Sequence, residues 1–161
     1  MKYNNILDYF IFCKKMDIGL SFFRKKNICV ERVIFEKSEI SEKMTEVERY
    51  IENIESIQIK LFYWEQDVSM KMYLSNFDLD FKDIKSYKGR TLPGIILIRM
   101  DHYFNKQFIK NLLLCHFNHD FSINPYLSVR PQILIQKNDK KNVILDIYDD
   151  RGMYVCFIDS C

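Results

Sequence analysis

The C-terminal stretch from Val143 to Ile158 is the feature that most limits what this chain can fold into. Two runs, Val143–Tyr148 and Met153–Ile158, alternate with the period of two that a β-strand imposes on its side chains. In each run one set of alternate residues is purely apolar and the other set is mixed. This pattern predicts an antiparallel hairpin in a sheet that is covered on one side.

The residues between the two runs are Asp149, Asp150, Arg151 and Gly152, and they predict a tight turn. Asp at the first position can accept the backbone N–H two residues on, and Gly152 is expected to adopt the left-handed conformation. An alternative assigns the Asp149/Asp150 pair, with Arg151, to acid–base catalysis. The turn explains the same residues by local structure alone, and we favour it.

Periodicity along the rest of the chain predicts three helices, over Asn4–Met16, Ser41–Ile54 and Asn105–Phe117, with Ser41 as an N-cap. Strands are predicted over Leu20–Phe23, Val30–Phe35, Ser56–Trp64, Met70–Leu74, Ile95–Ile98 and Gln132–Gln136. Helices and strands do not alternate regularly. The expected fold is therefore a single α+β domain over residues 1–161, an antiparallel sheet with a C-terminal three-stranded meander packed against two to three helices.

The composition excludes several classes of protein. A chain of 161 residues with 48% hydrophobic residues can bury a substantial core. A net charge of +2 is too small for nucleic-acid or membrane binding through bulk electrostatics. No signal peptide or stretch of transmembrane length is recognised, and the five cysteines form no CxxC pair. These features predict a cytoplasmic protein whose thiols stay reduced.

Cys115, His116, His119 and Asp120 are the nearest approach to a metal site, since all three residue types bind zinc. No second ligand pair stands at suitable spacing, so we interpret the histidines as structural. Cys115 with His116 could also form a nucleophile pair. With four glycines and no phosphate-binding loop, the sequence favours a protein that is not an enzyme and needs no metal or cofactor.

Two segments with aromatic residues beside carboxylates suggest a surface for a basic protein partner. The expected contact residues are Trp64, Glu65, Asp67, Asp78, Asp80 and Asp83. Charge reversal at Asp78, Asp80 and Asp83 together is expected to weaken binding. A further alternative is nucleic-acid binding through the basic segments Arg24–Lys26 and Lys85–Arg90.

The segments His116–Phe121, Pro125–Val129, Ile133–Asn138 and Val143–Val155 resemble the C-terminal half of a small bacterial family catalogued as a domain of unknown function. Members of that family end in a strand, a Tyr-Asp-Asp-Arg-Gly turn and a second strand, which Tyr148–Gly152 matches. The resemblance implies an immunity protein. Such a protein binds one toxin domain stoichiometrically, often a nuclease delivered by contact-dependent growth inhibition, and blocks it.

Overall fold

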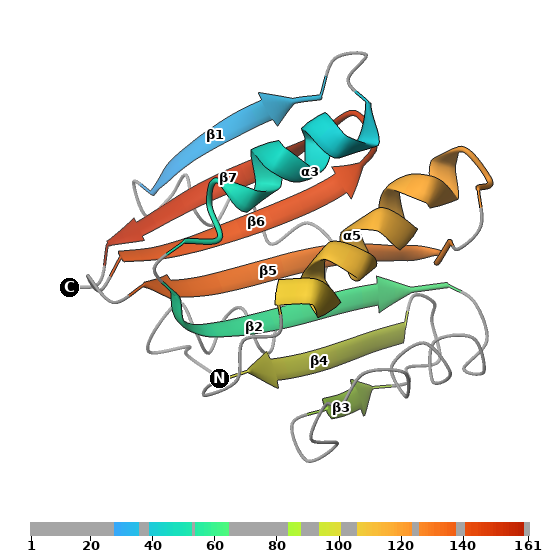
Figure 1. Cartoon of the computed structure of the whole chain (residues 1–161). Coiled ribbons are helices and arrows are strands. Elements are labelled where there is room, and N and C mark those ends of the chain that lie inside the picture. Colours follow the sequence, from blue (N-terminus) through green and yellow to red (C-terminus); the bar gives the residue numbers. More distant parts are fainter. Residues whose placement is uncertain are drawn as a thin grey trace.

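The computed structural model describes residues 28–35, 39–52, 54–64, 84–87, 94–100, 106–123, 126–137 and 141–159. There the chain forms a seven-stranded antiparallel sheet, in the order β1-β7-β6-β5-β2-β4-β3, and two helices (Figure 1). The elements are β1 (Cys29–Ile34), α3 (Ile40–Glu48), β2 (Ile54–Tyr63), β3 (Ile84–Tyr87), β4 (Gly94–Met100), α5 (Lys106–Asp120), β5 (Val129–Lys137), β6 (Lys141–Asp149) and β7 (Gly152–Asp159). The predicted α+β class is confirmed. The elements expected over Asn4–Met16, Leu20–Phe23 and Met70–Leu74 lie outside the described residues.

Both helices lie on the same face of the sheet and enclose the main hydrophobic core with it (Figure 1). The purely apolar sets of the C-terminal hairpin point into this core, since Leu145, Ile147, Met153 and Val155 are fully buried. Helix α5 packs on β5 and β6 and also contacts α3. The core face predicted from the alternation of β6 and β7 is therefore confirmed.

Helix α5 follows its prediction closely, because its apolar stripe is strong and unbroken. All six residues expected to face inward are buried: Phe108, Ile109, Leu112, Leu113, His116 and Phe117. The helix continues to Asp120, beyond the predicted end at Phe117. Within the described part of the chain, no helix combines the length and the apolar character needed to cross a lipid bilayer.

Helix α3 is shorter than predicted, and its predicted cap is wrong. Its N-cap is Glu39, whose backbone N–H donates to the Glu42 carboxylate at 3.1 Å, so Ser41 lies inside the first turn. The helix ends at Glu48, and the amides of Tyr50 and Ile51 bond three residues back instead of four. Because the helix ends in this tight turn, β2 begins at Ile54, the residue at which the helix was expected to end.

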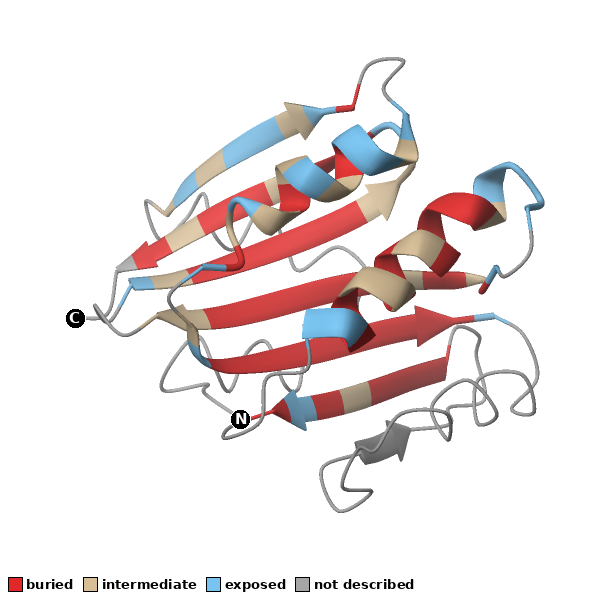
Figure 2. Cartoon of the chain, viewed as in Figure 1, coloured by how far each residue is buried: buried red, intermediate tan, exposed pale blue. Residues whose placement is uncertain are grey.

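The expectation of a sheet covered on one side is wrong, because the central strands are buried on both faces. Figure 2 shows long buried stretches along β2, β5 and β6, and β2 is buried from Ser56 to Tyr63. On the face away from the helices, Phe62, Leu134 and Ile144 are fully buried. The mixed sets of residues in these strands therefore face a second interior rather than solvent.

The second face carries a row of polar side chains centred on Asp146. Gln132 stands opposite Asp146 in the β5–β6 ladder, and Lys60 stands opposite Gln132 in the β2–β5 ladder. The Asp146 carboxylate accepts hydrogen bonds from Arg130 Nε at 3.1 Å, Arg130 Nη2 at 2.6 Å and Gln132 Nε2 at 3.1 Å. Burying a carboxylate costs free energy unless hydrogen bonds and an opposite charge compensate it. Removal of any one partner from this row should therefore destabilise the second face.

We expect Asp146→Asn to destabilise the fold by about 3 kcal/mol, because it leaves the Arg130 charge on a buried face without its carboxylate. The matched control is Asp149→Asn, which removes the charge from another Asp–Arg pair at an exposed turn. Urea unfolding of both variants measures the difference. Equal shifts of the two unfolding midpoints would contradict a special role for the buried pair.

Candidate interaction surface

The β6–β7 turn joins β1 to the hairpin. The backbone N–H of Arg151 donates to Asp149 Oδ1 at 2.8 Å, and the Arg151 guanidinium pairs with the same carboxylate. The backbone N–H of Phe35 donates to the Arg151 carbonyl oxygen at 2.8 Å. The turn therefore fixes its own shape with Asp149 and holds the end of β1 with its backbone.

Gly152 does not adopt the left-handed conformation that the sequence predicts, so this expectation is wrong. Glycine is needed at this position because neighbouring atoms leave no room for a side chain. A Cβ on Gly152 would collide with the carbonyl oxygen of Val33 in β1 and with the phenol of Tyr148. The close approach of β1 to β7 thus requires a residue with no side chain at this position.

Asp150 connects the same turn to both helices. Its backbone N–H donates to Asp120 Oδ2 at the end of α5, at 3.1 Å, and its carboxylate lies 3.6 Å from Lys43 Nζ of α3. The Lys43 side chain is buried, and its ammonium lies over the rings of Phe117 and Phe121 at 5.8 and 5.4 Å. The two carboxylates therefore pair with different cations: Asp149 with Arg151 of the same turn, and Asp150 with Lys43 of α3.

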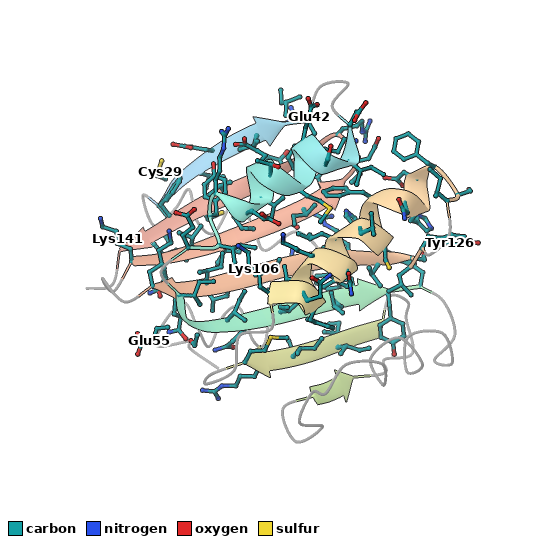
Figure 3. All side chains as sticks on the ribbon, viewed as in Figure 1. Cys29, Glu42, Glu55, Lys106, Tyr126 and Lys141 are labelled. Carbon is teal, nitrogen blue, oxygen red and sulfur yellow. The ribbon has the colours of Figure 1, made fainter. Side chains whose placement is uncertain are left out.

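A groove of about 600 Å³ runs between β1 and α3. Its lining residues are Val33, Ile34, Phe35, Glu42, Lys43, Thr45, Glu46 and Arg49. Figure 3 shows Glu42 where α3 faces the end of β1, and Glu42 is one of the lining residues. Burial, together with the negative charges of Glu46 and Glu31, raises the pKa of Tyr50 at the other end of α3. The groove lining therefore combines apolar residues at the end of β1 with two carboxylates, Glu42 and Glu46, and two cations, Lys43 and Arg49.

A second surface lies where β2 and α5 end. Trp64, one of the expected contact residues, is 39% exposed, and its backbone N–H donates to the Ser128 carbonyl oxygen at 3.3 Å. Phe121, Ile123 and Tyr126 are also exposed, although this stretch of the sequence carries only turn signals. Apolar residues spaced through a segment rich in turn residues are the signal that could have identified them. The other expected contact residues, Glu65, Asp67, Asp78, Asp80 and Asp83, lie outside the described part of the chain.

The residues weighed for zinc or nucleophilic chemistry are divided between interior and surface. Cys115 and His116 are buried neighbours on α5, and His116 Nδ1 donates to the Val129 carbonyl oxygen at 2.7 Å. His119 lies at the outer end of the helix, with Nδ1 3.4 Å from Asp120 Oδ1. Among the residues that the structure places, no three His, Cys, Asp or Glu side chains come together as a metal site would need.

Burial lowers the pKa of His116 to about 4, although the Val129 carbonyl and the charge of Asp120 oppose the shift. His116 Nε2 is buried and has no hydrogen-bond partner among the described residues. The imidazole is therefore neutral at pH 7, and the proton on Nδ1 serves to hold β5 against α5.

The free energy of unfolding should fall as the pH drops from 6.5 to about 4, because in that window the unfolded chain binds a proton at His116 that the folded protein rejects. The contribution of His116 is fully present above pH 6.5 and amounts to about 3 kcal/mol. Urea titrations at a series of pH values measure it. In His116→Gln the free energy of unfolding should depend less on pH between about 4 and 6.5, whereas His119→Gln should keep the wild-type dependence. The same pH dependence in wild type and His116→Gln would contradict the assignment.

The basic segments of the nucleic-acid alternative lie mostly outside the described residues. Arg24–Lys26 lies outside the described residues, and of Lys85–Arg90 only Lys85, Ser86 and Tyr87 are placed, as part of β3 at one edge of the sheet.

Comparison of the chain with protein-family models, with curated proteins and with solved structures finds no match.

Proposed function

We propose that this chain is an immunity protein that binds a bacterial toxin domain, one chain to one toxin, and neutralises it without chemistry. The resemblance of Tyr148–Gly152 and its flanking strands to immunity-associated sequences supports the proposal. The toxin is a nuclease delivered by contact-dependent growth inhibition, and the complex forms in the cytoplasm of the protected cell.

The observation that carries the proposal is the acidic surface of α3 beside the groove. Residues 39–55 contain six glutamates against Lys43 and Arg49, a local charge of −4 in a chain whose net charge is +2. Lys43 is buried against Asp150, Arg49 pairs with Glu46 at 2.8 Å, and Lys110 of α5 pairs with Glu48 at 3.1 Å. The excess negative charge of the segment is therefore that of Glu39, Glu42, Glu52 and Glu55. The six glutamates lie on α3, at its N-cap and in the segment that leads into the first residues of β2, so the negative charge is local in a chain that is slightly positive as a whole.

A nuclease toxin binds the phosphates of its substrate with a basic cleft, so an acidic inhibitor surface is complementary to it. Opposite charges steer the two proteins together and raise the association rate, while a few buried contacts hold the complex. In this proposal α3 and the groove supply the steering charge. Trp64 is one of the contacts that slow dissociation of the complex.

The direct test is protection from the toxin encoded beside the gene. Cells that express the C-terminal domain of a neighbouring secreted protein should stop growing, and co-expression of this chain should restore growth. The purified proteins should form a 1:1 complex in a calorimetric titration. Arrested growth with both proteins present, together with no binding, would contradict the proposal.

Neutralising the groove carboxylates should slow association with the toxin. We expect Glu42→Gln with Glu46→Gln to lower the association rate several-fold at low salt, and the loss should shrink at high salt because exposed charges are screened. Gln at position 42 keeps an oxygen that can accept the Glu39 N–H.

The matched control is Glu52→Gln with Glu55→Gln, which removes the same charge outside the groove lining, with Glu55 at the opposite end of the view in Figure 3. Stopped-flow association kinetics at two salt concentrations compare the two variants. Equal slowing in both would show that net charge, and not the groove, governs the encounter.

A further inference from the structure

Large apolar side chains are exposed mainly at one end of the molecule. Of the five described residues of this kind, Trp64, Phe121, Ile123 and Tyr126 follow the ends of β2 and α5, and Ile34 is the last residue of β1. We call the first four the aromatic platform. Scattered exposed apolar residues are normal in proteins, whereas a group gathered in one place marks an interaction surface.

The backbone under the platform is fixed by a strained helix end. The amide of Ser122 donates to the His119 carbonyl oxygen, and the amide of Ile123 donates to the Asn118 carbonyl oxygen, both at 3.1 Å. These bonds form a Schellman motif with Ser122 in the left-handed position, at φ 54°, where glycine is usual. The hydrophobic contact that commonly closes this motif is weak here, because Ile123 is 50% exposed. The strained turn therefore presents an apolar side chain to solvent.

The remaining platform residues are anchored to the folded core. The Leu127 amide donates to the Cys115 carbonyl oxygen at 3.2 Å, and Leu127 itself is buried. The Tyr126 ring lies 5.9 Å from the His119 ring on α5, and Trp64 is bonded through its amide to Ser128. Anchored aromatic side chains lose little conformational entropy on binding, which favours their use as interface anchors.

The charges beside the platform favour a cationic partner. Near Phe121 the β6–β7 turn and the end of α5 bring together three carboxylates, Asp120, Asp149 and Asp150, against two cations, Lys43 and Arg151. Lys43 and Arg151 are paired with Asp150 and Asp149, so Asp120 is the carboxylate in excess. It accepts the Asp150 N–H and lies beside His119.

We propose that the aromatic platform is the energetic centre of the interface with the toxin domain, which offers it an apolar cluster flanked by Lys or Arg side chains. The inference rests on the proposed function and adds to it the site that holds the complex. The groove beside α3 governs how fast the proteins meet, and the platform governs how slowly they separate. Trp, Tyr and Phe anchors surrounded by polar groups are typical of such centres.

A peptide library displayed on phage tests the platform without the toxin. Peptides selected on the purified wild-type chain should combine aromatic or aliphatic residues with Lys or Arg. Their affinity should fall about tenfold or more on Phe121→Ser with Tyr126→Ser and stay within about twofold on Cys29→Ser, an exposed residue of β1 outside both the platform and the groove lining. Selection of no peptides, or of peptides that bind all variants equally, would overturn the platform as a docking site.

The toxin domain then tests the occupant. Phe121→Ser with Tyr126→Ser should raise its dissociation rate about tenfold or more without changing the salt dependence of association. Cys29→Ser should leave the dissociation rate unchanged. Unfolding midpoints of all variants, measured by circular dichroism, check that each is folded. Toxin bound equally by wild type and platform variant would overturn this inference and leave the proposed function standing. Toxin not bound by wild type, with peptides mapped to the platform, would overturn the proposed function and the toxin as occupant, but not the docking site.

Discussion

The turn between β6 and β7 is the constraint on which the described structure depends, because α3, α5 and the end of β1 are all bonded to it. Asp150 bonds to the end of α5 through its amide and to Lys43 of α3 through its carboxylate. The Arg151 carbonyl accepts the amide of Phe35, and Gly152 leaves room for the backbone of β1. The relative placement of the two helices and the edge strand β1 therefore follows from a few adjacent residues of the hairpin.

The two surfaces with an inferred role are linked through Lys43 of α3, which pairs with Asp150 of this turn. Lys43 lines the groove and also lies under Phe121 of the platform, so one buried ammonium ion links the two. Because the central strands are buried on both faces, the exposed large apolar residues lie at the ends of β1, β2 and α5 and in the segment before β5. A protein built this way offers a partner a fixed shape and charge pattern, which suits stoichiometric inhibition.

The strands of the hairpin and helix α5 could be predicted because the spacing of their apolar residues fits only one type of secondary structure with one buried face. Ser41 was wrong as a cap because the paired side chain of Glu42 favours an earlier start. The reason for Gly152 is a contact with β1, far away in the sequence, which no local pattern carries. Phe121 was missed because an aromatic residue is assumed to be buried unless a tertiary structure shows otherwise. Lys60 is the opposite case: a lysine is expected to be exposed, but this one is fully buried in β2.

The stoichiometry of neutralisation tests most directly whether this protein acts by binding alone. The measurement is residual nuclease activity of a fixed amount of purified toxin domain as increasing amounts of this chain are added. Our account predicts a linear decline that ends at one chain per toxin, with full toxin activity recovered after the two proteins are separated under denaturing conditions and the toxin is refolded. Loss of activity at far less than one chain per toxin, with the recovered toxin permanently altered, would show catalysis and contradict the account.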